Sequence, residues 1–506
     1  MQRRNFLKLV GAGALTPLLS QFASAAEILA GSAADTWAAN FAAAGAASPW
    51  PLAYRSINKD LAADASVTGR FPAAVQGVLY RNGPAVHELG GQRYHHWFDG
   101  DGMMQRFAIT DNKVRHTGKI IRTEKYAVEA AAGKRLYSSF GTSIPGARAP
   151  SSPDSLNVAN ISVLSLNGEL LALWEGGSAY RMDPDSLQTR GPKIWRDDLA
   201  ALPFSAHPRV DPDGTVWNFG ISMLDNVMVL YQIGVDGKLR KADAISIPQI
   251  SMVHDFAVTD KHLVFLLPPL LFDRDKFSSG TSYLDAHAWK PELGMRVLVV
   301  DKNDWSKRQW MQLPAGFLFH VGNAWEDAQG TIRMDYIHTE DPSILFKDTR
   351  EVMRGQFSRS AVHQIAQVSI DTKRGKASQQ FIAIDAEFPR IDPRLTGYRH
   401  QHIYHATETW ADHPGFSAIA RTNLESGKTD KYSYGTATIA EEHIFVPEPG
   451  SAAGAAGWIL GTSLDLDKKL TRLSCFASDR LADGPVAQAS LPYALPIGLH
   501  GTFAKA

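Results

Sequence analysis

Short apolar segments separated by turn signals repeat from about residue 51 to the end of the chain, and this pattern constrains the fold most. Runs rich in Val, Ile, Leu and aromatic residues, such as "ISVLSLNGELLALWE" and "GMRVLVVDKND", alternate with Asn-Gly, Asp-Gly and Asp-Pro-Asp-Ser turns. Long helical periodicity is scarce. The pattern predicts many short antiparallel strands, with no break in composition, across residues 51–506.

One closed all-β body accounts for such a pattern better than a sandwich, which would be unusually long. A β-propeller removes exposed sheet edges by radial repetition, and it leaves a central axis lined by the inner strands. We therefore predict a single propeller domain over residues 51–506. The last strand of a closed ring must be held firmly, so the C-terminal segment "LPIGLHGTF" is not expected to fray.

The N-terminal segment is typical of a twin-arginine export signal. Arg3-Arg4 precedes a short, weakly apolar stretch and a small-residue site that ends at Ala25. The apolar stretch is too short and too interrupted to span a membrane. Residues 1–25 are predicted to be a cleaved signal peptide, which implies a periplasmic protein. Residues 26–50, rich in Ala, Gly and Ser, are predicted to be a linker or a loosely docked arm.

Charge and cysteine content exclude several function classes. The 52 basic and 52 acidic residues cancel, so nothing favours binding to nucleic acid. The one cysteine, Cys475, cannot form an internal disulfide and is predicted to be a buried structural thiol.

Four of the 17 histidines stand apart because each follows an apolar or small-residue stretch and precedes a turn or a strand. They are His207, His254, His320 and His500, spaced 47, 66 and 180 residues apart. Histidines so far apart converge only in a radial fold. On the residues alone, the alternative that they are hydrogen-bonded core histidines stays open.

A rival group of histidines lies in "YRHQHIYHA". In a strand His400 and His402 would share one face, whereas His405 would lie on the other. A facing pair is short of ligands for a metal site.

Ten segments in order, from residue 77 to residue 503, resemble the carotenoid cleavage oxygenase family. They include "GVLYRNGP", "YHHWFDGDGMMQRF", "SAHPRVDPDGT", "MVHDFAVTDKHLVF", "FHVGNAWED", "AEFPRIDP", "HIFVPEP" and "IGLHGTF". The resemblance implies a seven-bladed β-propeller with a non-haem Fe(II) on its axis. It also implies cleavage of a C=C double bond with O2 to give two carbonyl products.

The family motifs place the metal ligands at His207, His254, His320 and His500. Three glutamates behind the histidines match Glu175, Glu387 and Glu442, with Glu441 as the adjacent alternative to Glu442. Carboxylates at such positions fix the orientation and tautomer of ligating rings and offset the charge of the metal. Iron is the expected ion, because the reaction needs O2 and thiolate ligands are absent.

Two residues bear on the substrate. Trp174 lies directly before Glu175, where the stilbene-cleaving branch of the family would carry a lysine, and its apolar ring favours a carotenoid or apocarotenoid. Ile161 takes a position where the family often has Thr or Val close to the open metal position. Both residues are predicted to line a substrate tunnel.

Alternatives remain at this stage. The same iron centre can cleave a stilbene-like phenolic compound, the family also includes an isomerase, and a propeller can carry an apolar ligand without turnover. The segment "FLLPPLLF" at 265–272 is predicted to form an apolar patch at the tunnel mouth that contacts a membrane. Its alternative is a buried strand followed by a Pro turn.

Overall fold

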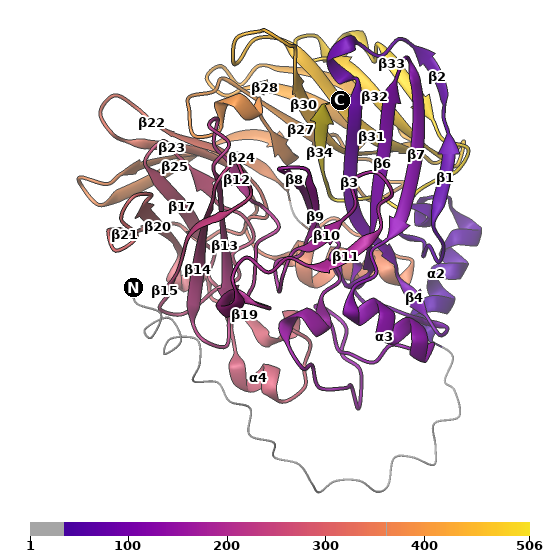
Figure 1. Ribbon diagram of the computed structural model, residues 1–506, viewed down its shortest axis with the longest axis horizontal. Coiled ribbons are helices and arrows are strands. Elements are labelled where there is room, and N and C mark those ends of the chain that lie inside the picture. Colours follow the sequence, from indigo (N-terminus) through magenta and orange to yellow (C-terminus); the bar gives the residue numbers. More distant parts are fainter. Residues whose placement is uncertain (1–34, 361, 506) are drawn as a thin grey trace, which may run out of the picture.

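The chain folds into a seven-bladed β-propeller (Figure 1). The structure is a computed structural model, and it describes residues 35–360 and 362–505. Seven antiparallel sheets of four or five strands form the blades. One edge strand of each sheet lies toward the centre, where these strands pack against those of neighbouring blades, as β22 does against β16 and β26. The predicted all-β, seven-bladed fold is confirmed.

The first three blades follow the chain in order. The first contains β1 (Leu61–Asp64), β3 (Gly77–Val86), β6 (Asp101–Thr110), β7 (Lys113–Ile120) and the C-terminal β34 (His500–Lys505). The second contains β8 (Ser162–Leu166), β9 (Glu169–Leu173), β10 (Tyr180–Met182) and β11 (Thr189–Pro192). The third contains β12 (Arg209–Val210), β13 (Val216–Ser222), β14 (Val227–Ile233) and β15 (Leu239–Ser246).

The remaining blades complete the ring. The fourth contains β16 (Ala257–Val258), β17 (His262–Leu267), β20 (Met295–Asp301) and β21 (Arg308–Leu313). The fifth contains β22 (Val321–Glu326), β23 (Ile332–His338), β24 (Gln364–Asp371) and β25 (Lys376–Asp385). The sixth contains β26 (Glu387–Arg390), β27 (His402–Thr407), β28 (Ala418–Asn423) and β29 (Thr429–Ser433). The seventh contains β2 (Ser66–Gly69), β30 (Thr438–Pro447), β31 (Gly457–Asp465), β32 (Leu470–Ala477) and β33 (Ala487–Ser490).

Both ends of the chain close the ring. The C-terminal β34 pairs with β3 in the first blade, where His500 lies opposite Asn82. The early strand β2 pairs with β33 in the last blade. A Cβ at Gly83 would lie 2.4 Å from Cα of Gly498, so the two segments can approach this closely only because residue 83 is glycine. The expectation that the C-terminal segment is held in the fold is confirmed.

Local sequence signals explain individual strands. The Asn167-Gly168 pair joins β8 to β9, and both residues have positive φ (48° and 75°), as a two-residue hairpin turn requires. Strand β7 alternates exposed and buried residues along its length. The buried apolar side chains gather between adjacent blades. Met104 and Tyr80 of the first blade, for instance, pack in one cluster with Val163 and Leu170 of the second.

Helices are short and lie outside the blades; they are α2 (Thr36–Ala47), α3 (Glu124–Ala132), α4 (Arg274–Ser278) and α5 (Thr349–Glu351). Helix α2 corrects the prediction of a linker over residues 26–50. Asp35 accepts a hydrogen bond from the backbone N of Trp37 and caps the helix, and Phe41 is buried with the Arg93 guanidinium 3.3 Å from its ring. From residue 35 onward the linker alternative is thus wrong, and the segment is an N-terminal arm whose Phe41 packs against Tyr94 and Val352. The predicted signal peptide at residues 1–25 lies outside the described residues.

The segment 265–272 is mostly core, which corrects the prediction of an exposed patch. Phe265 to Leu270 are buried, and only Leu271 and Phe272 are partly exposed. The two prolines connect β17 to the short ribbon of β18 (Leu270–Phe272) and β19 (His287–Trp289), so they turn the chain within the core. A second small ribbon joins β4 (Glu88–Leu89) and β5 (Gln92–Arg93). Within residues 35–360 and 362–505, no helix is long and apolar enough to cross a membrane.

Candidate metal centre

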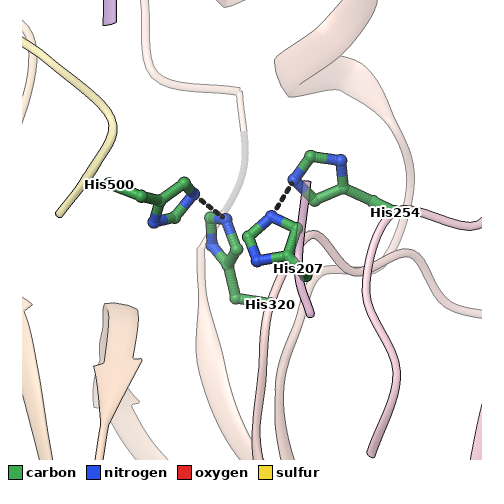
Figure 2. A group of neighbouring side chains, drawn as sticks. All are labelled: His207, His254, His320 and His500. Carbon is green, nitrogen blue, oxygen red and sulfur yellow. Dashed lines mark hydrogen bonds between the residues drawn. The ribbon is translucent and has the colours of Figure 1, made fainter. Parts of the chain in front are cut away.

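The four predicted histidines meet at the centre of the ring (Figure 2). His207, His254 and His320 lie just before the inner strands β12, β16 and β22, and His500 begins β34. One ring nitrogen from each of the four lies within 4.8 Å of those of the others. The structure thus brings together four imidazoles from four different blades.

The facing ring nitrogens are those of a cation site. Nε2 of His320 lies 3.1 Å from Nε2 of His500, while Nδ1 of each ring donates to a carboxylate. With the protons on Nδ1, both Nε2 atoms carry lone pairs that point at each other, which is repulsive unless a cation lies between them. Nε2 of His207 and Nε2 of His254 lie 2.9 Å apart in the same group. The donor set therefore fits a metal ion.

Each of three histidines has its own glutamate. Nδ1 of His254 donates to Glu175 at 2.7 Å, Nδ1 of His320 to Glu387 at 2.5 Å, and Nδ1 of His500 to Glu442 at 2.8 Å. Each blade contributes one of the seven side chains: Glu175 follows β9, Glu387 begins β26 and Glu442 lies in β30. In the described part of the chain, His207 alone among the four has no carboxylate partner for its ring.

Burial and neighbouring charges shift the pKa values of the site in both directions. Burial would lower the pKa of His254, but Glu175 outweighs it and the pKa is raised. Burial lowers the pKa of His500 to about 4, although Glu442 opposes this shift. Burial and the neighbouring histidines lower the pKa of His207 well below its usual value. Burial would raise the pKa of Glu387, but His320 outweighs it and the pKa falls to about 2. His500 thus presents a neutral ring to the gap at neutral pH.

Two arginines that the sequence reasoning missed hold the last blade and the C-terminal segment together. Arg390 binds the Glu442 carboxylate at 2.7 Å and thereby orients the group that orients His500. Arg81 binds the Glu441 carboxylate at 3.1 Å and donates to the backbone oxygen of Glu442. Glu441, the alternative to Glu442, thus contacts Arg81 and the backbone N of Gly498 rather than a histidine ring. Arg81 lies in "GVLYRNGP" and Arg390 in "AEFPRIDP", two of the segments that resemble the family. Their position in these segments could have marked both arginines as site residues.

A second pair, Arg209 and Asp255, links the three segments that carry His207, His254 and His320. Both carboxylate oxygens of Asp255 lie 2.7 Å from Nη2 of Arg209, and the guanidinium also donates to the carbonyls of Phe256 and Val321. Asp255 further accepts from the backbone N of Val321 at 2.7 Å. This arrangement, called here the Arg209–Asp255 bracket, ties together β12, β16 and β22 beside their histidines.

Backbone strain is localised beside the centre. Phe388 has φ of 56°, which is unfavourable for a residue with a side chain, and its ring stacks on His320 with centroids 5.4 Å apart. Its backbone N donates to the Glu387 carboxylate at 2.5 Å. With this backbone conformation, the Glu387 carboxylate and the Phe388 ring both contact His320.

The rival histidines do not meet. Nε2 of His400 lies 2.9 Å from Asp335, and Nε2 of His405 bonds Thr422 at 2.9 Å. The group of four around the axis is the metal-type cluster found in the described part of the chain.

A cavity of about 510 Å³ opens beside His254, His320 and His500. Its volume lies within the range of small-molecule sites, roughly 300–1,000 Å³. Aromatic side chains dominate the wall next to the histidines: Trp97, Phe98, Phe140, Trp174, Phe319 and Phe388. The predicted tunnel residues Trp174 and Ile161 both line it. A Cβ at Gly176 would lie 2.5 Å from the Trp174 ring, so that glycine lets the indole fold over its own loop.

Comparison with known proteins agrees with this geometry. The sequence model described as retinal pigment epithelial membrane protein matches residues 54–505. The chain is 30% identical over 467 residues to an apocarotenoid-15,15'-oxygenase from Synechocystis, covering 87% of this chain and 92% of that one. The chain belongs to the carotenoid cleavage oxygenase family.

Other members of this carotenoid cleavage oxygenase family span a range of named activities. An isoeugenol monooxygenase from Pseudomonas nitroreducens is 28% identical, covering 87% of this chain and 94% of that one. Among solved structures, cobalt-substituted Synechocystis apocarotenoid oxygenase superposes with a TM-score of 0.82 at 28% identity. The superposition covers 90% of this chain and 98% of that one.

Proposed function

We propose that this chain is a non-haem Fe(II) dioxygenase that cleaves a C=C double bond of a carotenoid or apocarotenoid with O2 to give two carbonyl products. One observation carries the proposal: four imidazoles with facing nitrogens form one cluster, and three of them line a large, mainly apolar cavity. A metal held only by neutral rings keeps its full charge. An apolar cavity next to it suits a lipophilic polyene.

His207, His254, His320 and His500 would hold the iron, which when bound would supply the activation of O2. Glu175, Glu387 and Glu442 hold three of the rings in the tautomer that presents Nε2 to the metal. The aromatic wall excludes water and places the flat conjugated chain beside the histidines. The electron-rich double bond itself supplies electrons, so no separate reductant is needed.

Anaerobic loading with Fe(II), followed by addition of polyenes in air, tests the proposal. We expect O2 uptake and two carbonyl fragments whose masses sum to those of the substrate and one O2. Absence of O2 uptake with every polyene would instead favour the non-catalytic carrier.

The identity of the metal ligands is tested separately by metal content. His500→Ala is expected to lose bound iron while the ring stays folded. His402→Ala, in the rival group, is the matched control and should keep it. Stoichiometric iron in His500→Ala would remove His500 from the ligand set.

A phenolic substrate of the stilbene type is the second candidate. It is favoured by the relatives named isoeugenol monooxygenase and lignostilbene-alpha,beta-dioxygenase, which match the chain nearly as well. Trp174 in the cavity wall argues for the polyene, because an indole offers no charge to a phenolate. Including a hydroxystilbene in the same panel separates the two.

We further propose export to the periplasm by the twin-arginine route, supported by Arg3-Arg4 and the small-residue site ending at Ala25. A peripheral membrane contact, if the lipophilic substrate is drawn from a bilayer, would use Leu271 and Phe272 rather than the whole 265–272 segment. Fractionation of a tagged full-length chain, compared with an Arg3→Lys/Arg4→Lys variant, tests the export.

A further inference from the structure

A part of the cavity wall carries a buried histidine that the metal centre does not use. His363 lines the cavity, and the residue is 7% exposed. Neither of its ring nitrogens has a hydrogen-bond partner among the residues that the structure describes. Leaving buried polar nitrogens unpaired is unfavourable, because they lose the hydrogen bonds that they make with water in the unfolded chain. Such a group in the wall of a ligand cavity indicates a partner supplied by the ligand.

Three polar neighbours of His363 in this wall are paired within the protein. His413 bonds the carbonyl of Pro414 and the hydroxyl of Ser417. Asp348 accepts from Ser358, and Glu441 accepts from Arg81. Unlike these three side chains, His363 has ring nitrogens that can bond a ligand in the cavity.

The Asp385 carboxylate lies beside Nδ1 of His363 without forming a hydrogen bond to it, and its charge favours a proton on that nitrogen. Its Oδ1 lies 3.5 Å from Nδ1 of His363 and accepts from the backbone N of the same residue, while its Oδ2 accepts from Arg359 at 2.5 Å. Burial would raise the pKa of Asp385, but His363 and Arg359 outweigh it and the pKa is lowered. The ionised carboxylate draws the ring proton to Nδ1, which leaves a lone pair on Nε2.

We propose that His363 binds a hydroxyl group at one end of an otherwise apolar, conjugated substrate, by accepting its proton in a hydrogen bond at Nε2. The ring sits against Phe416, 6.1 Å between centroids, so its surroundings suit a hydroxyl carried on an apolar ring or chain. The proposal rests on the proposed function for the placing of the substrate in this cavity. A hydroxylated apocarotenoid and a phenol share this chemistry.

The test compares matched substrates that differ by one hydroxyl. Binding to the iron-loaded enzyme is measured without O2 by quenching of tryptophan fluorescence, since Trp97, Trp174 and Trp410 line the cavity. One arm uses an apocarotenal with and without a ring hydroxyl, and the other uses 4-hydroxystilbene and stilbene. The wild type should bind the hydroxylated member of at least one pair about tenfold more tightly. The arm that shows the difference identifies the source of the hydroxyl.

His363→Phe should abolish this preference and leave the affinity for the plain compound unchanged. Thr409→Val, which alters another cavity-lining side chain, is the matched control and should keep the preference. Equal affinities in the wild type for both pairs would overturn the proposal. An equal loss for both members of a pair in His363→Phe would also overturn it, because it would show a structural role. If His363→Phe does not fold, the smaller His363→Leu serves the same comparison.

Oxygen uptake separates this proposal from the proposed function. A hydroxyl preference in binding without O2 uptake would support the His363 subsite and refute the dioxygenase. Turnover of both members of a pair with equal kcat/KM and equal affinity would support the dioxygenase and refute the His363 subsite.

Discussion

At the scale of single residues, carboxylates determine which ring nitrogen of three site histidines carries the proton. Each glutamate accepts a hydrogen bond from Nδ1, which leaves Nε2 free to bind a metal. Glu442 is the most enclosed of these carboxylates at 1% exposure, and it contacts both His500 and Arg390. Glu442→Gln leaves the shape nearly unchanged but removes the charge that holds the Nδ1 proton. We expect iron affinity to fall roughly 10–100-fold, measured by competition with a chelator, with little change in thermal midpoint. Glu448→Gln, beyond the end of the same strand, is the control, and equal affinities for the two variants would contradict the role of Glu442.

The sequence was informative about these residues only through resemblance. Spacings of 47, 66 and 180 residues say nothing about convergence without the closed ring. Motif position chose Glu442 over Glu441 correctly, but it could not reveal that Arg81 occupies the latter. Glu175 follows a strand of the second blade, whereas its partner His254 precedes a strand of the fourth. Such a pairing depends on the directions of the side chains in three dimensions. The sequence does not single out His363, because what distinguishes it is that its buried ring nitrogens lack a hydrogen-bond partner in the described part of the chain.

At the scale of elements, the Arg209–Asp255 bracket fixes three inner strands relative to one another. Arg209→Met would leave the Asp255 carboxylate buried and unpaired, which costs roughly 3–5 kcal/mol. We expect that loss in the free energy of unfolding by urea, together with weaker iron binding, because three histidines lose their common anchor. Asp255→Asn in the same chain should recover part of the loss.

The matched control is the partly exposed pair of Arg333 and Asp327, in which the guanidinium is 45% exposed. Arg333→Met should change stability by less than about 1 kcal/mol, because solvent screens exposed ion pairs. Similar losses at both sites would show that the bracket acts as an ordinary surface pair.

The type of an element could be predicted where its hydrophobic periodicity was clear. The prediction failed where it rested on amino-acid composition. The Asn167-Gly168 hairpin formed as its sequence indicates. Residues 36–47, "TWAANFAAAGAA", were interpreted as a linker because of their small residues, yet alanine is the best helix former and Asp35 supplies a cap. In "FLLPPLLF" the adjacent prolines favour an exposed patch, but in the structure they end the strand β17 inside the core.

At the scale of the whole molecule, closure of the ring and assembly of the metal centre are one event. The strand that completes the first blade begins with His500, and the last blade is completed by β2 from the start of the chain. A metal that binds only the folded state adds stability by mass action. The pattern of strands predicted a closed body, but the sharing of blades between the two chain ends depends on long-range pairing that no local signal encodes.

Buried neutral histidines distributed over the blades make the whole fold acid-sensitive. Burial lowers the pKa to about 3 for His96 and His116 and to about 4 for His287 and His405. Because these folded-state pKa values lie below the unfolded value of about 6.5, the unfolded chain takes up protons first as the pH falls. The stability they provide is therefore complete above about pH 6.5 and is lost progressively toward pH 4.

Asp101 opposes this trend, since burial raises its pKa to about 6 and the folded state takes up its proton first. Taken alone, these four rings against Asp101 leave a net three groups at about 1.4 kcal/mol each, which is a slope of roughly 4 kcal/mol per pH unit below about pH 5.5. We expect the urea midpoint of the metal-free protein to fall steeply from pH 6.5 to pH 5, and His405→Gln to reduce this part of the slope by about one third. A midpoint independent of pH in this range would show that these rings are already protonated, or hydrated, in the folded chain.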